Sequence, residues 1–144
     1  MKADAKTEAA VMSTLSKFIE AHVSRDMDSA LSFLAPDPDL VYIGTGVDEK
    51  RLGLNEVRVQ LERDWAQTEA ASIELGWSSV SAAGSVAWVA ADAIVHAKVS
   101  GQEMSFAGRL TAVLEQRRGR WLLMQRHFSV PARGQAEGES IPPK

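Results

Sequence analysis

Residues Val86–Ser129 read VAWVAADAIVHAKVSGQEMSFAGRLTAVLEQRRGRWLLMQRHFS and carry the pattern that determines the fold. Apolar and polar side chains alternate along three segments of this stretch, as they do in half-buried β-strands. Ser100-Gly101 and Arg118-Gly119 separate the segments, and both pairs suit two-residue hairpin loops. The stretch therefore predicts two consecutive hairpins that share their central strand.

The loops also predict which residues face each other, because a two-residue turn sets the register of a hairpin. Around the first loop, Asp92 lies opposite Arg109 and Lys98 opposite Glu103, so opposite charges meet twice. Around the second loop, the same rule places His127 opposite Leu110. Both registers are predictions about which side chains share a face of the sheet.

Because strand side chains alternate between faces, these registers divide the sheet into two surfaces. The predicted helix-facing surface is almost wholly apolar and contains Ala87, Val89, Ala91, Ala93, Val95, Met104, Phe106, Gly108, Leu110, Ala112, Leu114, Trp121, Leu123, Gln125, His127 and Ser129. The predicted outer surface contains Trp88, Asp92, Ile94, His96, Lys98, Glu103, Arg109, Thr111, Val113, Met124, Arg126 and Phe128.

The first half of the chain has helical periodicity instead. An apolar stripe of Val11, Leu15, Phe18 and His22 predicts a helix over about residues 7–24. We expect a short second helix capped by Asp26, which ends at residue 35 because a proline follows.

A third helix with an apolar face of Leu54, Val57, Leu61 and Trp65 is expected, capped by Asn55. Residues 40–43 predict a short strand before it, and a charged loop follows that strand up to residue 53. From about residue 71 a further strand begins. Its alternation changes parity at Ser78-Ser79, which indicates a β-bulge.

Composition favours one ordinary globular domain. The chain has 144 residues, of which 45% are hydrophobic and 24% charged. We expect a domain over residues 7–131, of the α+β class, with a cone-shaped curved antiparallel sheet packed on three N-terminal helices, and a flexible tail over residues 132–144. The net charge of −3 argues against a nucleic-acid partner. No segment predicts a membrane span or a signal peptide, so we expect a cytoplasmic protein.

Several motifs together resemble the nuclear transport factor 2-like superfamily, and within it the SnoaL-like group. They are Asp28-x-x-Leu31 leading to Pro36-Asp37, Gly53 before the third helix, Gly108-Arg109-x-Thr111, and Gly119-Arg120-Trp121 with His127-x-Ser129. The resemblance implies the cystatin-like α+β roll with a pocket inside the cone. The superfamily includes isomerases, cyclases, dehydratases, adaptors and assembly modules, so the resemblance does not name a reaction.

The chain end also resembles the association domain of calcium/calmodulin-dependent kinase, an assembly hub. There a pocket arginine lies in the strand before the last hairpin turn, and the matching position here is Ala112. We therefore expect a small, mostly apolar ligand that is neutral or weakly polar rather than a strong anion.

The predicted pocket combines a few polar groups with aromatic walls, the usual form of a small-molecule site. Its expected members are Tyr42, Trp65, Phe106, Ala112, Gln125, His127 and Ser129. His127 is the candidate catalytic acid or base. The alternative is a core histidine bonded to a backbone carbonyl or to Tyr42.

Other polar groups favour structural interpretations. Asp92 and Arg109 predict a cross-strand pair on the outer face, and Asp37 and Asp39 lie in a proline-flanked turn. The three histidines are dispersed and cysteine is absent, so neither a metal site nor a cofactor is expected.

Trp88, Val113, Met124 and Phe128 form an apolar group on the predicted outer face. Such a group is an exposed patch unless a partner covers it, and we expect a homodimer through it. Three functions stay open at this point: a ligand-binding protein, a small isomerase, cyclase or dehydratase that uses His127, and a non-catalytic association module.

Overall fold

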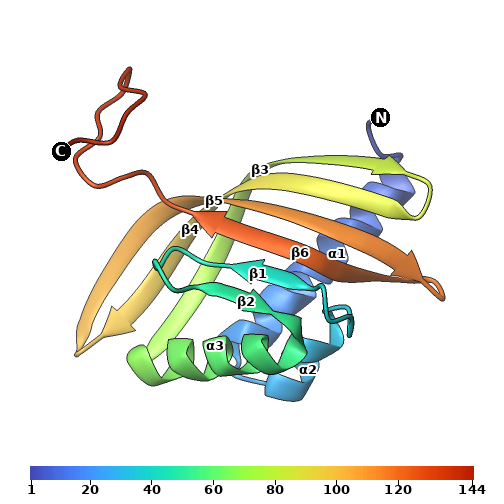
Figure 1. Ribbon diagram of the computed structural model, residues 1–144, viewed down its shortest axis with the longest axis horizontal. Helices are drawn as coiled ribbons and strands as arrows, with labels where there is room; N and C mark the ends of the chain where they lie inside the picture. Colours follow the sequence, from blue (N-terminus) through green and yellow to red (C-terminus); the bar gives the residue numbers. More distant parts are fainter.

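The computed structural model describes residues 1–144 and contains three helices and one six-stranded sheet (Figure 1). The helices are α1 (Ala5–Val23), α2 (Met27–Ser32) and α3 (Gly53–Gln67). The strands are β1 (Val41–Ile43), β2 (Lys50–Leu52), β3 (Ala70–Ala83), β4 (Val86–Val99), β5 (Gln102–Arg117) and β6 (Arg120–Ser129). The α+β class is confirmed. None of the helices combines the length and apolarity needed to cross a membrane.

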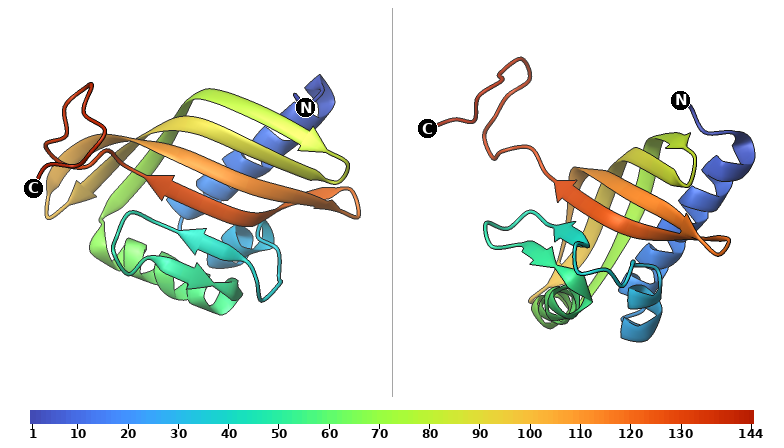
Figure 2. Two further views of the ribbon diagram at one scale, coloured as in Figure 1. Left: turned by 45° about the horizontal axis from the view of Figure 1, so that its top comes forward. Right: turned by 45° about the vertical axis from the view of Figure 1, so that its right-hand side comes forward.

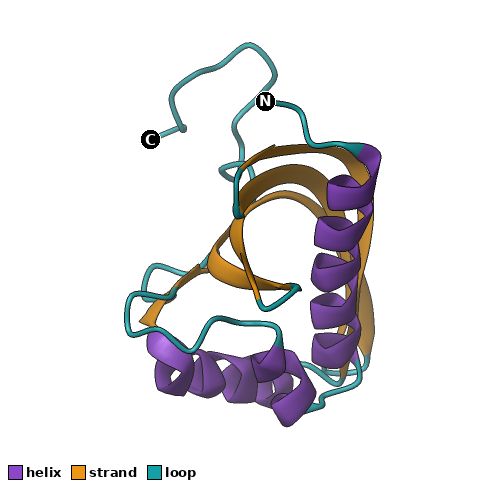
Figure 3. Ribbon diagram, turned by 90° about the vertical axis from the view of Figure 1, so that its right-hand side faces the viewer, coloured by secondary structure: helices purple, strands orange, loops and turns teal.

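The strands lie in the order β2-β1-β6-β5-β4-β3, and all neighbours are antiparallel except β1 and β6. The long strands β3 to β6 curve strongly across the molecule (Figure 2). Helix α1 runs along the curled sheet, while α2 and α3 lie across one end of it (Figure 3). The sheet therefore has an inner face toward the helices and an outer face away from them.

The inner face and the helices share one apolar core. Val11 and Leu15 of α1, Leu61 of α3 and Leu114 and Leu123 of the sheet are all almost completely buried. These positions follow the helical and strand periodicities of the sequence, because burial of the apolar face is what stabilises an amphipathic element.

The helix caps match the sequence in one case and differ in another. Asp26 caps α2 by accepting a hydrogen bond from the Ser29 backbone N–H at 3.1 Å, as predicted. The prediction that Asn55 caps α3 is wrong, because α3 begins two residues earlier at Gly53 with no side-chain cap. There the Gly53 N–H donates to the Leu40 carbonyl, and φ of +77° makes glycine the suitable residue.

Strand β2 replaces part of the loop predicted before α3. Its three residues, Lys50, Arg51 and Leu52, pair antiparallel with β1. Such a short and polar segment has no alternation to identify it in the sequence. Hydrogen bonding to β1 makes this segment a strand, and it places β2 at the edge of the sheet.

The predicted β4–β5 register is confirmed. Asp92 pairs with Arg109, and Lys98 pairs with Glu103. Both hairpin loops have two residues with positive φ, as tight turns of this kind require. The expected bulge in β3 is also present, slightly earlier than predicted, between Leu75 and Ser78.

The predicted β5–β6 register is wrong beyond the first residues of the hairpin. A bulge between the pairs Leu114–Leu123 and Val113–Gln125 adds Met124 to β6 without an opposite residue. His127 therefore lies opposite Thr111 instead of Leu110. Because one extra residue moves every later side chain to the other face, the bulge exchanges the two faces of β6.

The tail differs in character from the rest of the chain. Residues 132–144 contain no helix or strand and are mostly exposed. They extend away from the sheet beyond the end of β6 (Figures 1 and 2).

Candidate functional site

A cavity of about 340 Å³ lies between α1, α3 and the inner face of the sheet. Fourteen of its 23 lining residues are hydrophobic: Leu15, Phe18, Ile19, Tyr42, Ala71, Ile73, Ala93, Val95, Ala97, Val99, Met104, Phe106, Leu110 and Phe128. The side chains of Met104 and Phe106 are partly exposed, so the β4–β5 end of the cavity is open to solvent. The cavity lies in the size range of small-molecule sites.

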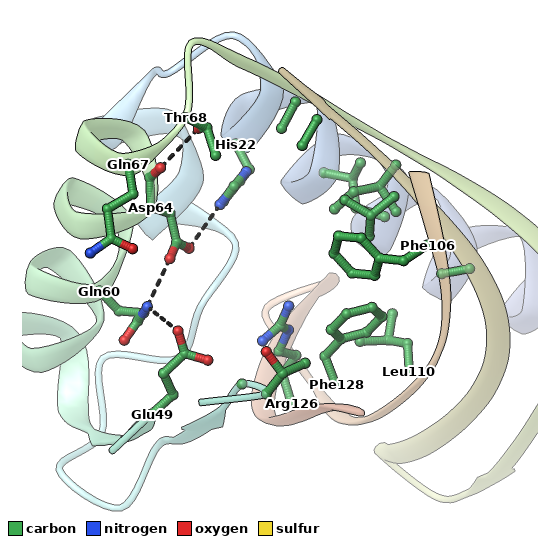
Figure 4. Close-up of a pocket in the computed structure, with 18 of the residues that line it drawn as sticks. His22, Glu49, Gln60, Asp64, Gln67, Thr68, Phe106, Leu110, Arg126 and Phe128 are labelled. Carbon is green, nitrogen blue, oxygen red and sulfur yellow. Dashed lines mark hydrogen bonds and ion pairs between the residues drawn. The ribbon is translucent and has the colours of Figure 1, made fainter. Parts of the chain in front are cut away.

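The cavity has a polar side along α3, formed by Glu49, Gln60, Asp64, Gln67 and Thr68, opposite the aromatic side chains of the sheet (Figure 4). Gln60 is the common partner of Glu49 and Asp64. Its amide nitrogen donates to Glu49 at 3.0 Å and to Asp64 at 2.7 Å, and its oxygen accepts from Arg51 at 3.1 Å. Gln60 is only 2% exposed, so these bonds give both N–H groups and the oxygen of a buried amide a partner and hold both carboxylates in place.

His22 and Asp64 form the one pair in the cavity with the composition of an acid–base dyad. The His22 Nε2 atom lies 3.3 Å from Asp64 Oδ2. In the neutral tautomer that donates Nε2–H to Asp64, the Nδ1 atom carries the lone pair. Nδ1 makes no hydrogen bond with the protein. Every fully buried side-chain nitrogen in the structure has a hydrogen-bond partner, so Nδ1 is not fully buried and can be reached from the cavity.

Contacts between the ends of α1 and α3 set the position of this dyad. The indole N–H of Trp65 donates to the His22 carbonyl at 3.0 Å, and the two rings meet edge to face. Arg25, just beyond α1, donates to the carbonyls of Trp65 and Thr68 at the end of α3. An arginine at a helix C-terminus also complements the helix dipole, so the tie is favourable on both counts.

Arg126 brings a guanidinium group to the opposite side of the cavity (Figure 4). It pairs with Tyr42 across the parallel β1–β6 contact, and its guanidinium carbon lies 4.3 Å from the Tyr42 ring centre. The same group donates to the Ile43 carbonyl at 3.0 Å. Cation–π contact and one backbone bond therefore hold the charge in place.

Tyr42 is buried between Arg126 and the Phe18 ring, yet its hydroxyl makes no hydrogen bond with the protein. Burial raises the pKa of this phenol above its ordinary value of 10.0, although the Arg126 charge opposes the shift. The hydroxyl therefore stays protonated at neutral pH. It is available as a donor to a molecule in the cavity.

The structure separates the residues that the sequence grouped into a pocket. Tyr42 and Phe106 line the cavity. Gln125, His127 and Ser129 are on the outer face, because the Met124 bulge changes their orientation. His127 is exposed there and is not positioned to act in the cavity.

Two further members of the predicted pocket lie outside the cavity lining. Trp65 packs against the His22 ring and donates a hydrogen bond to the His22 carbonyl, so it helps to position the dyad. Ala112 is 2% exposed and belongs to the apolar core.

The bulge also divides the apolar group that was predicted for the outer face. Trp88 and Val113 pair on the outer face and border a second pocket of about 210 Å³. Phe128 lines the cavity instead, and Met124 occupies the bulge itself. The outer face keeps a large exposed side chain in Trp88, which is 39% exposed.

The acidic groups that the sequence assigned to structural roles are paired or exposed. Asp37 accepts from Arg117 at 2.7 Å, and this bond lowers the pKa of its carboxyl below the ordinary value of 3.8. Asp92 is exposed on the outer face opposite Arg109. Neither aspartate lines the cavity.

Sequence reasoning missed His22, Asp64 and Arg126. His22 was counted within the apolar stripe of α1, and Asp64 lies one residue before Trp65 in a highly charged helix. A signal for Arg126 does exist: residues 121–124 (Trp-Leu-Leu-Met) are four consecutive apolar residues, which breaks the alternation of β6 at the bulge.

Solved structures with the same fold come from several bacteria. A nuclear transport factor 2-like superfamily protein from Salmonella enterica serovar Typhimurium aligns with a TM-score of 0.82 and 15% identity, over 95% of this chain and 99% of that one. A candidate dehydratase of the same family from Streptomyces avermitilis aligns with a TM-score of 0.80 and 20% identity, over 90% and 99%.

A third similar structure is a candidate calcium/calmodulin-dependent protein kinase II association domain from Xanthomonas campestris, with a TM-score of 0.75 and 20% identity over 91% of this chain and 90% of that one. At these identities the likeness shows the fold alone. No curated protein shows significant sequence similarity to the chain. The family profile described as SnoaL-like domain, however, matches residues 11–133. The chain therefore belongs to the SnoaL-like family, and its fold is that of the nuclear transport factor 2-like superfamily.

Proposed function

We propose that this protein binds a small, mostly apolar organic molecule in the cavity between α1, α3 and the sheet. The observation that carries the proposal is the lining itself: a largely apolar surface of a 340 Å³ cavity, with a few polar groups converging on it. Binding sites for small molecules have this form, because apolar burial supplies affinity and the polar groups set orientation. A cavity that served only packing would be filled by side chains.

Thermal-shift screening of a metabolite library tests this function with two variants. Ala97 lines the cavity and Ala107 lies on the outer face, so Ala97→Leu narrows the cavity while Ala107→Leu adds the same atoms outside it. Ligands present at about 100 times Kd should stabilise the native protein by roughly 2.7 kcal/mol. We expect Ala107→Leu to keep this response and Ala97→Leu to lose it. Equal responses in all three proteins would contradict the proposal.

A second candidate function is acid–base catalysis on the bound molecule, as in an isomerase, cyclase or dehydratase. The supporting observation is the His22–Asp64 pair in the cavity, which takes the role that the sequence assigned to His127. A carboxylate that orients an imidazole leaves the other nitrogen free to accept a proton. The dehydratase description of the Streptomyces protein is consistent with this chemistry.

Incubation of a screened ligand in heavy water, followed by NMR, tests the catalytic function. Exchange of a ligand C–H for deuterium, or conversion of the ligand, should slow by roughly 10²- to 10⁴-fold in His22→Gln. His96→Gln is the matched control, because His96 lies on the outer face. An unchanged rate in His22→Gln would refute a role for the dyad and leave the binding function intact.

We also propose that the protein forms a homodimer through the outer face of the sheet. Trp88, Trp77 and Ile94 expose apolar surface on β3 and β4, and water-exposed patches of this kind favour association. Trp88→Glu should convert a dimer to a monomer in sedimentation experiments, whereas Val47→Glu, in a fully exposed loop, should not. An unchanged mass in Trp88→Glu would refute this interface. If the cavity binds nothing and the dimer persists, a non-catalytic association module becomes the favoured function.

A further inference from the structure

Arg126 is a cation in the cavity without an acidic partner. Its guanidinium donates to one backbone carbonyl, and no carboxylate lies within ion-pair distance of it. Arg63 and Arg117 differ, because each of them pairs with two acidic side chains. A partly buried charge without a counter-charge is costly, so a ligand that supplies one gains binding energy.

The two carboxylates that line the cavity do not supply this counter-charge, because both are already engaged. Glu49 accepts from the Gly46 backbone N–H at 2.6 Å, from Gln60 at 3.0 Å and from Arg63 at 3.2 Å. Asp64 accepts from Gln60 and lies against His22. Each oxygen of these two carboxylates therefore has a hydrogen-bond partner, whereas the Arg126 guanidinium keeps donors without one.

The Met124 bulge places this charge in the cavity. Without it, the register would turn Arg126 to the outer face and leave the cavity with neutral side chains from β6. Bulges often reorient a side chain beside a functional site, at the expense of ladder pairing. The lost ladder pairing is therefore consistent with a function for Arg126 in the cavity, which regular pairing would prevent.

We propose that the cavity binds carboxylic acids, with the carboxylate paired to Arg126 and the apolar body packed against Phe106 and Phe128. The proposal rests on the ligand-binding function above and names its substrate class. A planar guanidinium can donate two parallel hydrogen bonds to a carboxylate, and Arg126 uses only one nitrogen for the Ile43 carbonyl. The unpaired Tyr42 hydroxyl lines the same cavity and remains a phenol at neutral pH, so it can donate a further bond.

This inference revises the expectation of a neutral ligand. That expectation followed from Ala112, where the association domain carries its pocket arginine. Here the cation comes from β6 instead of β5, and Ala112 pairs with Arg126 across the two strands. The charge is supplied from the neighbouring position on the sheet.

A matched set of compounds tests the proposal by isothermal titration calorimetry. The probes are ω-phenylalkanoic acids from phenylacetate to phenylhexanoate, their primary amides, and ω-phenylalkylamines of the same lengths. We expect at least one acid to bind native protein roughly tenfold more tightly than its amide, because hydrogen bonds between charged partners exceed neutral ones by about that factor. Arg126→Met should abolish the preference. Arg109→Met, on the outer face, should retain it.

Every result of the titrations bears on the proposal. Equal affinity of acid and amide for the native protein would overturn the carboxylate site but leave the binding function standing. Tighter binding of the amine would overturn it as well, and would assign recognition to Asp64 and Glu49. Binding by no probe of any length would overturn both proposals. Arg126→Lys guards against a folding defect in Arg126→Met, because it keeps the charge and should preserve part of the preference for acids.

Discussion

Gly108 is the position where a single methyl group should most directly test the geometry of the cavity wall. A Cβ atom at Gly108 would lie 2.4 Å from the Phe128 ring and 2.8 Å from the Ser129 carbonyl oxygen. Ordinary van der Waals contact begins near 3.4 Å, so the ring would have to move by about 1 Å. The carbonyl belongs to the β6 backbone and cannot move without disturbing its pairing with β5.

The expected effect of Gly108→Ala is a net loss of unfolding free energy. Overpacking typically costs about 1–3 kcal/mol, and the lower entropy of the unfolded chain returns roughly 0.4–1 kcal/mol. A net loss on the order of 1–2 kcal/mol should therefore appear in urea denaturation followed by circular dichroism. The displaced Phe128 ring should also weaken any ligand that binds in the cavity.

Gly76→Ala is the matched control, because a Cβ atom there would meet its nearest neighbour, Asp92, at an ordinary 3.8 Å. This variant should be as stable as the native protein or slightly more stable. In a Phe128→Leu background, the cost of Gly108→Ala should shrink, since the two closest ring atoms are gone. Native stability of Gly108→Ala in the original background would refute the proposed packing of Phe128 and, with it, the bulged register.

Three further outcomes follow from the structure. Leu61→Ala should cost roughly 2–5 kcal/mol of unfolding free energy in urea, because the side chain is completely buried; a loss below that of an exposed site would contradict the core assignment. Because the pKa of Asp37 is lowered, its bond to Arg117 stabilises the fold above pH 3.8, and this stabilisation is lost as the pH falls through the lower pKa of the folded protein. Asp37→Asn should therefore have a smaller free energy of unfolding than the native protein at neutral pH, and the two values should converge in acid. A difference that stays constant with pH would refute the linkage. Removal of residues 132–144 should leave the melting temperature unchanged, and a lower value would show that the tail packs on the domain.

Wherever a local pattern sufficed, the sequence predicted the structure. The stripe of Val11, Leu15 and Phe18 predicted α1, because an amphipathic helix shows its period directly. The two hairpin loops predicted the β4–β5 register, including the Asp92–Arg109 pair. These are interactions between near neighbours or across short turns, so the chain itself contains the information.

The candidate site depended on features without a local signature. His22 and Asp64 are 42 positions apart and meet only because α1 and α3 pack at their ends, where Arg25 and Trp65 tie the helices together. A periodic pattern cannot report such a meeting. It shows that each helix has an apolar face, but not which polar groups lie beside one another when the faces close.

By itself, the sequence determined the class of fold, the order of its elements apart from β2, and the inner face of β4 and β5, since periodicity and turn chemistry act over a few residues. Only the tertiary structure decided what the cavity contains. One unpaired residue, Met124, exchanges the faces of β6, so Arg126 enters the cavity and His127 leaves it. The physical reason is that side chains alternate with a period of two: a single added residue preserves the strand but reverses every orientation beyond it, and the packing of the whole sheet determines where that residue is placed.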